Sequence, residues 1–215
     1  MERYTLAFKT DEGQYHGFVT ALRENWADLT GLLDALHIRN FSLWNIDRLV
    51  FGYCESEEPV KTGEAERLTL DRLCRSMEAF GEWISRPGQN MRLMYEDFGV
   101  IRESKELIRH RVFVTELKDG MQEEYKRRHD VLAAARGGAV SPGPDSNFSI
   151  WNAGSYIFGY DEIDVTMEQE PTEESRQETI AWETKMLEIM EWHTDDVDWI
   201  TGMHHGHIRR IGYHM

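Results

Sequence analysis

The sequence lacks several features that define common classes of protein. Its 215 residues include only two cysteines, Cys54 and Cys74, and no CxxC pair, which excludes a disulfide framework and a cysteine-based zinc site. It has no apolar run of membrane-spanning length, and its first residues contain no apolar signal core. These absences predict a protein of the reducing cytoplasm.

Basic residues are fewer than acidic ones. The chain has 24 Lys and Arg against 39 Asp and Glu, which gives a net charge of −15. This charge repels a nucleic-acid backbone and an anionic membrane, so we expect neither as a partner. A neutral small molecule is unaffected by it. Hydrophobic residues make up 40% of the chain and are sufficient for a packed core.

One fifteen-residue segment occurs twice. FSLWNIDRLVFGYCE at 41–55 and FSIWNAGSYIFGYDE at 148–162 share eight residues and lie 107 positions apart. In each copy, apolar residues stand on both sides of a short turn-forming segment, NIDR or NAGS. This pattern predicts a β-hairpin in each half of the chain.

Each hairpin is predicted to lie between the same elements. A strand and an amphipathic helix precede it, at 3–9 and 11–37 in the first half and at 111–118 and 119–136 in the second. A helix and a short strand follow it, near 66–83 and 91–96 and again near 172–192 and 207–213. The order β-α-β-β-α-β, used twice, predicts an α+β fold of two ferredoxin-like repeats.

The repeats define the expected domains: 1–98, a connector at 99–110, and 111–215. A ferredoxin-like sheet has helices on one face only, so its other face must be covered. We expect the two sheets to pair within the chain, as in a dimeric α/β barrel. The protein would then be a monomer that acts as an internal pseudo-dimer, with further self-association open. Two independent repeats are the alternative, which would leave both apolar sheet faces in water.

The helix at 119–136 carries two titratable side chains on the face that should point toward its sheet. Tyr125 and His129 are four residues apart and therefore lie one above the other. A histidine gives and takes protons near neutral pH, which fits general acid–base catalysis. On spacing alone, a hydrogen-bonded structural histidine is the other interpretation.

GMQEEYKRRHD, followed by NFSIWN and FGYDE, resembles the L-rhamnose mutarotase family over most of 111–213. The resemblance implies an enzyme without metal, nucleotide or redox cofactor that interconverts the α and β anomers of a 6-deoxyhexose such as L-rhamnose or L-fucose. It implies that His129 is catalytic and that Tyr125 binds the sugar or relays a proton.

The resemblance also implies sugar-binding residues, with two departures. Phe148 stands where the family usually has a sugar-binding Tyr, and Glu183 stands where it often has a second Trp beside the one at Trp182. Phe148 and Trp182 would be flat apolar walls for the monosaccharide. Asn152 could bind sugar hydroxyls or stabilise its own turn. Trp151, beside it, is a further candidate for sugar binding.

The first half lacks the proton-transfer pair. At the offset of 107, Phe18 corresponds to Tyr125 and Leu22 to His129. The second half, in turn, has glycines and prolines at 137–144 that should end its helix early. The loop at 137–146 could be a lid over the pocket or a tolerated surface loop.

A histidine cluster near the C-terminus has two interpretations. It consists of His204, His205, His207 and His214. His205 and His207 would share one side of a strand and could bind a metal, or the strand could be solvated and lie at the edge of the pocket. One of these histidines could also be a second proton-transfer group.

Two other functions stay open beside the mutarotase. One is a non-catalytic sugar-binding or regulatory protein of the same fold, which the departures at Phe148 and Glu183 keep in view. The other is a pocket for a small aromatic or haem-type ligand, which ferredoxin-like folds also hold.

Overall fold

A computed structural model describes residues 1–102, 104–194 and 208–215. The chain forms two compact units, Met1–Met91 with Ile208–Met215 and Arg92–His207. Each unit has one five-stranded antiparallel sheet. None of the described helices is long and apolar enough to cross a membrane.

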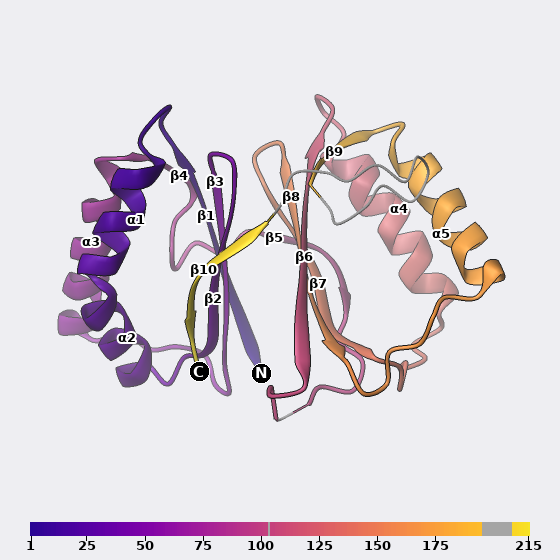
Figure 1. Cartoon of the computed structure of the whole chain (residues 1–215), viewed down its shortest axis with the longest axis horizontal. Helices are drawn as coiled ribbons and strands as arrows, with labels where there is room; N and C mark the ends of the chain where they lie inside the picture. The colour runs from indigo at the N-terminus through magenta and orange to yellow at the C-terminus, as the bar shows by residue number, and fades with distance from the viewer. Residues whose placement is uncertain (103, 195–207) are drawn as a thin grey trace. The chain divides into compact units, whose positions relative to one another are not determined.

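In the first unit, three helices cover one face of the sheet, whose strand order is β10-β2-β3-β1-β4 (Figure 1). Its elements are β1 (Glu2–Thr10), α1 (Tyr15–Glu24), α2 (Trp26–Ala35), β2 (Arg39–Ile46), β3 (Leu49–Ser56), α3 (Glu64–Glu78), β4 (Gly81–Ser85) and β10 (Arg209–His214). The core lies between the helices and the sheet and includes Phe8, Phe18, Leu22 and Leu43.

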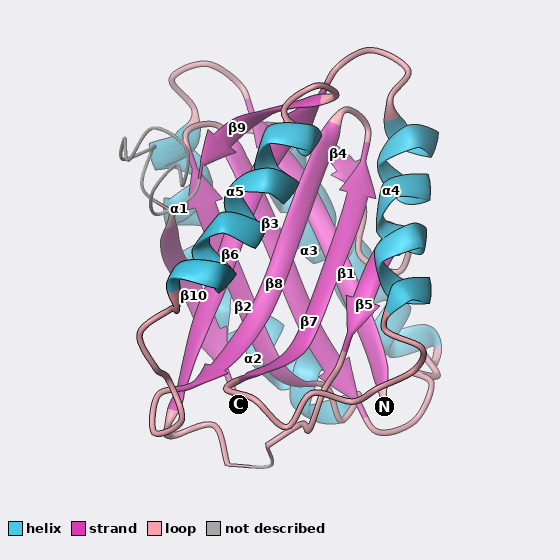
Figure 2. Ribbon diagram, turned by 90° about the vertical axis from the view of Figure 1, so that its right-hand side faces the viewer, coloured by secondary structure: helices cyan, strands magenta, loops and turns pink. Residues whose placement is uncertain are grey.

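In the second unit, α4 and α5 cover one face of a sheet of order β5-β7-β8-β6-β9 (Figure 2). Its elements are β5 (Arg92–Asp97), β6 (Ile108–Leu117), α4 (Gln122–Ala135), β7 (Asp145–Ala153), β8 (Tyr156–Asp164), α5 (Glu173–Met186) and β9 (Met190–Thr194). The core again lies between helices and sheet.

The α+β class and the ferredoxin-like order are confirmed in both units. Four strands of each sheet follow the ferredoxin-like order, which is β2-β3-β1-β4 in the first unit and β7-β8-β6-β9 in the second. The pairing of the two sheets with each other stays a prediction.

The segments 91–96 and 207–213 were expected to be the last strands of the first and the second repeat, and this expectation is wrong. β4 and β9 already occupy the edge beside the first strand of each repeat. The open edge is at the second strand, where β5 pairs with β7 of the second unit and β10 with β2 of the first. The compact units therefore differ from the contiguous ranges 1–98 and 111–215, because each half of the chain gives one strand to the other unit.

The predicted helices at 66–83 and 172–192 are too long. α3 ends at Glu78 and α5 at Met186. The segments that follow, GEWIS and MEWHT, contain aromatic and β-branched residues and form edge strands. Trp83 pairs with Phe8, and Trp192 pairs with Thr115.

The predicted helix at 11–37 is two helices that meet at Asn25. The Asn25 side-chain Nδ2 donates to the carbonyl oxygen of Ala21 at 2.9 Å. Such local side-chain bonds compete with the helical ladder and favour a helix end.

The two hairpins repeat their contacts as well as their residues. Asn45 Nδ2 donates to two carbonyl oxygens of the first turn at 3.0 and 2.9 Å, and Asn152 Nδ2 does the same in the second at 3.0 and 2.9 Å. The turn residues Asp47 and Gly154 have φ of 47° and 62°, which the short connection requires. The hairpins are therefore equivalent scaffold elements.

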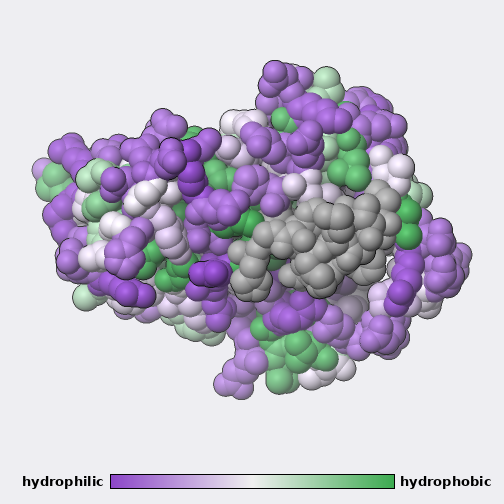
Figure 3. Space-filling view, turned by 45° about the horizontal axis from the view of Figure 1, so that its top comes forward, coloured by the Kyte–Doolittle hydropathy of each residue, from purple (hydrophilic) through white to green (hydrophobic). Residues whose placement is uncertain are grey.

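The visible surface is largely hydrophilic, with scattered apolar side chains (Figure 3). This agrees with the net charge of −15, which favours solubility.

Candidate functional site

Helix α4 places Tyr125 and His129 in the core of the second unit, against its sheet. Their side chains are 2% and 4% exposed, and their rings stack with centroids 4.3 Å apart. His129 Nδ1 lies 3.0 Å from the backbone oxygen of Tyr125. Because a carbonyl only accepts, Nδ1 carries the proton, and Nε2 is left as the basic nitrogen.

Burial sets the protonation states of this pair. Desolvation lowers the pKa of His129 to about 4, so the imidazole is neutral at pH 7. Desolvation also raises the pKa of Tyr125 above its ordinary value, so its hydroxyl keeps its proton. The site thus combines a neutral base with a hydroxyl donor.

Two other predicted site residues lie beside this pair. The ring of Trp182, on α5, is 5.1 Å from that of His129 in an edge-on arrangement. Phe148, on β7, and Trp182 are both half-buried and pack on the core cluster that contains Tyr125. The structure therefore brings Tyr125, His129, Trp182 and Phe148 together between helices and sheet.

Trp151 and Asn152 are placed differently. Ile150 packs in the helix-side core, so Trp151, the next residue of β7, points to the opposite face of the sheet. Its Nε1 donates to Ser149 Oγ at 2.9 Å. The Asn152 amide nitrogen bonds the hairpin turn, as the turn-stabilising interpretation expects.

Tyr95 is a site residue that the sequence reasoning missed. It lies on β5, is 5% exposed, and its ring is 5.3 Å from that of His129 and 5.6 Å from that of Phe148. Its buried hydroxyl has no hydrogen-bond partner within the described part of the chain. Burial also raises the pKa of this phenol. No sequence signal pointed to it, because β5 was assigned to the other repeat.

Ion pairs connect β5 to α4 at the two ends of the strand. Arg92 forms a bidentate salt bridge with Glu123, in which Nη2 and Oε2 are 2.9 Å apart. Arg136 forms a salt bridge with Asp97. The Arg136 guanidinium also lies 5.7 Å from the centre of the Tyr95 ring. Exposed pairs contribute little stability, and β5 is held in place by its pairing with β7. The pairs mark the two points at which the strand that carries Tyr95 meets the helix that carries His129.

Two charged residues of EEYKRRH, Glu124 and Arg128, form contacts that connect α4 to the end of α5. Arg128 Nε donates to Glu124 Oε1 at 2.8 Å, and its Nη2 donates to Glu188 Oε2 at 2.9 Å. Arg128 Nη1 also donates to the backbone oxygen of Lys185 at the end of α5. These bonds tie α4 to α5 and so position His129 relative to Trp182.

The region after α4 and the C-terminal histidines were also singled out. α4 ends at Ala135, and Gly137 and Gly138 follow with φ of 60° and 77°, so the early helix end is confirmed. The role of the 137–146 loop as a lid stays a prediction.

Three of the C-terminal histidines, His204, His205 and His207, lie outside the described residues. His214 lies on β10 in the sheet of the first unit rather than in that of His129, and its Nε2 is 2.7 Å from Asp34 Oδ1. Residues 1–102, 104–194 and 208–215 contain no group of three His, Cys, Asp or Glu side chains that could hold a metal ion.

Residues 110–205 match the family model for L-rhamnose mutarotase. No curated protein matches the chain. A solved structure described as an anthrone oxidase-like protein is 13% identical, with a TM-score of 0.40, and the match covers 98% of this chain and 93% of that one. The family match supports a mutarotase-type function. It confirms the relationship that GMQEEYKRRHD indicates: the second half of the chain matches the L-rhamnose mutarotase family.

Proposed function

We propose that the second unit is an aldose mutarotase that interconverts the α and β anomers of a 6-deoxyhexose. The observation that carries the proposal is the buried His129, whose pKa is lowered to about 4 and whose Nδ1 is held by the Tyr125 carbonyl. That arrangement leaves a neutral Nε2 among aromatic rings. At pH 7 this nitrogen is unprotonated and can accept a proton from a hydroxyl.

Ring opening needs two proton movements. His129 Nε2 takes the proton of the anomeric hydroxyl, the C1–O1 bond becomes a carbonyl, and the C1–O5 bond breaks. The ring oxygen O5 receives the proton from the imidazolium that has just formed. The low pKa favours this second transfer, because it strengthens the imidazolium as an acid, and it weakens the imidazole as the base of the first transfer to the same extent. Rotation about C1–C2 and the reverse steps give the other anomer, with no net change of protons or electrons.

The remaining site residues hold the sugar. Trp182 and Phe148 are flat walls for its C–H faces, and the Tyr125 hydroxyl orients it beside His129. Phe148 lacks the hydroxyl that the family's Tyr would supply. Tyr95, whose ring is 5.6 Å from that of Phe148, supplies a hydroxyl in its place. One sugar contact then comes from β5, in the first half of the sequence.

A non-catalytic sugar-binding protein is the second candidate. Glu183 favours it, because this residue occupies the position of a second family Trp and is itself buried, at 6% exposure. A carboxyl group cannot replace an aromatic wall. The proton-transfer pair is nevertheless intact, which favours the enzyme.

Saturation-transfer NMR of the anomeric protons separates these candidates. The mutarotase should accelerate exchange between the anomers of L-rhamnose or L-fucose, and His129→Ala should abolish the acceleration. Unchanged exchange together with a sugar-dependent change in Trp fluorescence would show a binding protein. A coloured, haem-bound preparation would contradict both.

A further inference from the structure

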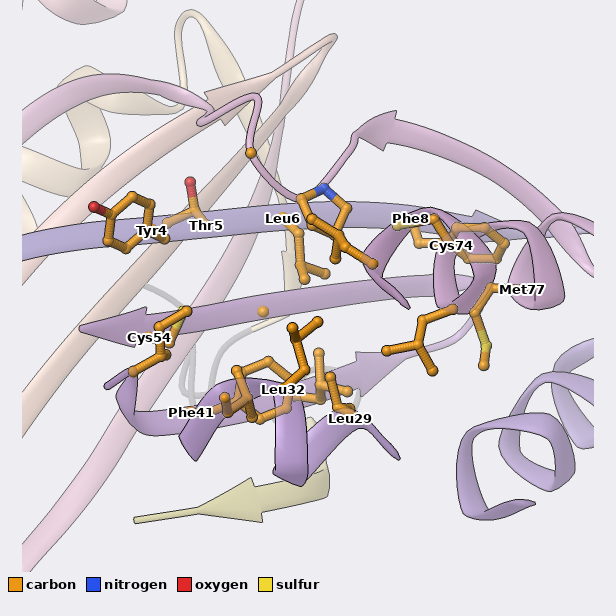
Figure 4. Close-up of a pocket in the computed structure, with 18 of the residues that line it drawn as sticks. Tyr4, Thr5, Leu6, Phe8, Leu29, Leu32, Phe41, Cys54, Cys74 and Met77 are labelled. Atoms are coloured by element: carbon orange, nitrogen blue, oxygen red, sulfur yellow. The ribbon is translucent and has the colours of Figure 1, made fainter. Parts of the chain in front are cut away.

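The first unit contains an apolar cavity of about 370 Å³ between its sheet and its three helices (Figure 4). Leu6 and Phe41 line it from the sheet, and Leu29, Leu32 and Met77 line it from the helices. None of the residues that line it is charged. The cavity meets solvent near Thr62 and Gly88, which are exposed lining residues.

This cavity occupies the place that corresponds to the candidate site of the second unit. Phe18 and Leu22, the counterparts of Tyr125 and His129, are buried and line it. In the second unit the rings of Tyr125 and His129 stack at that place, with an edge-on contact to Trp182. The first unit has Leu22 in place of the His129 ring. This leaves apolar space where the second unit has its proposed proton-transfer group.

Two polar side chains of the cavity wall, Thr5 and Tyr4, are engaged within the protein. Thr5 Oγ1 accepts a hydrogen bond from the backbone nitrogen of Met91 at 3.1 Å, and Tyr4 Oη accepts one from that of Val60 at 2.9 Å. Burial beside Glu55 raises the pKa of the Cys54 thiol to about 12, so the thiol is neutral. A charged ligand would have no ionic partner here, and a sugar would leave most of its hydroxyls without one.

We propose that the first unit binds a neutral, apolar small molecule of one to three rings in this cavity. Its volume is within the range of small-molecule sites and exceeds the roughly 150 Å³ of an engineered apolar cavity that binds benzene. Van der Waals contact with leucine, phenylalanine and methionine side chains supplies the binding. The inference is independent of the proposed sugar chemistry.

The neutral aromatic probe N-phenyl-1-naphthylamine tests the proposal, because its fluorescence rises in apolar surroundings. Titration into the full chain should give a saturable rise that corresponds to one molecule per chain and that excess L-rhamnose does not reverse. Leu22→Phe, which places a ring in the cavity, should weaken binding at least tenfold. The control Val131→Phe adds a ring at an exposed position of α4 and should leave binding unchanged.

A second measurement uses the unaltered protein and so does not depend on how a variant folds. Trp83 also lines the cavity. Bound probe should shift the indole NMR signal of Trp83 in ¹⁵N-tryptophan-labelled protein in a saturable manner. A rise in emission that does not saturate, displacement of the probe by L-rhamnose, or no shift of Trp83 at saturating probe would overturn the proposal.

Discussion

The two units share a strand order but differ in what fills the space between helices and sheet. In the second, a histidine, a tyrosine and a tryptophan pack ring against ring. In the first, phenylalanine and leucine line a cavity without charged groups. Where the second unit has Tyr125 and His129, proposed above as its proton-transfer pair, the first has Phe18 and Leu22, while the hairpins of the two units remain equivalent.

The largest expected effect is a loss of anomer exchange on substitution of His129, with no loss on substitution of its counterpart Leu22. His129→Gln removes the proton acceptor and should lower the enzyme-dependent rate of anomer exchange by about 10²- to 10⁴-fold. Leu22→Met, a volume-conserving change at the equivalent place, should leave this rate unchanged. The two rates are measured by NMR with L-rhamnose. An equal loss in both variants would remove the distinction between the units.

The pH dependence of stability should also depend on His129. Its pKa of about 4 in the folded state lies below the roughly 6.5 of an unfolded histidine, so the unfolded chain binds more protons between these values. The stabilisation is complete above about pH 6.5 and is lost as the pH falls toward 4, by up to about 3 kcal/mol.

Urea unfolding of the wild type and of His129→Gln from pH 7.5 to 4.5 measures this loss. The wild type should lose more free energy of unfolding than the variant as the pH falls. Parallel curves would mean that His129 is not desolvated in the fold.

Tyr95 tests whether the strand from the first half completes the site. Tyr95→Phe removes one hydroxyl and should lower kcat/KM about 3- to 10-fold, the effect of one neutral hydrogen bond. Phe148→Tyr in the same chain restores a hydroxyl nearby and should recover part of the loss. A role in folding alone would change the melting temperature without rescue by Phe148→Tyr.

The smallest expected difference is that between the two hairpins, and it tests whether they are energetically equivalent. Tyr53 Oη donates to Glu55 at 2.8 Å, and Tyr160 Oη donates to Glu162 at 2.9 Å, at the same offset of 107. Tyr53→Phe and Tyr160→Phe should each lower the free energy of unfolding by about 1–3 kcal/mol and by similar amounts, as measured by urea unfolding. A loss in one variant only would show that the hairpins are not energetically equivalent.

The sequence allowed the hairpins and α4 to be predicted because their information is local. Turn residues such as Asp47 and Gly154 define the hairpins, and the four-residue spacing of Tyr125 and His129 defines a helix face. The ends of α3 and α5 were missed, because GEWIS and MEWHT become strands only through pairing with β1 and β6.

The exchanged strands could not be predicted for a related reason. β5 and β10 carry nothing that distinguishes the open edge of one sheet from that of the other, and the choice depends on distant pairing. Tyr95 was missed for the same reason, because it lies on β5 and reaches the site only through the pairing of β5 with β7. Trp151 is adjacent to Asn152 in sequence, but its direction depends on which face of β7 packs on the helices.

The most direct test of the division between the units is a titration of ¹⁵N-tryptophan-labelled protein with L-rhamnose, with signals assigned by Trp→Phe variants. Trp182 lies beside His129, and Trp83 lines the cavity of the first unit. The account predicts that the indole signal of Trp182 shifts in a saturable manner while that of Trp83 stays in place. A saturable shift of Trp83, or no shift of Trp182, would contradict it.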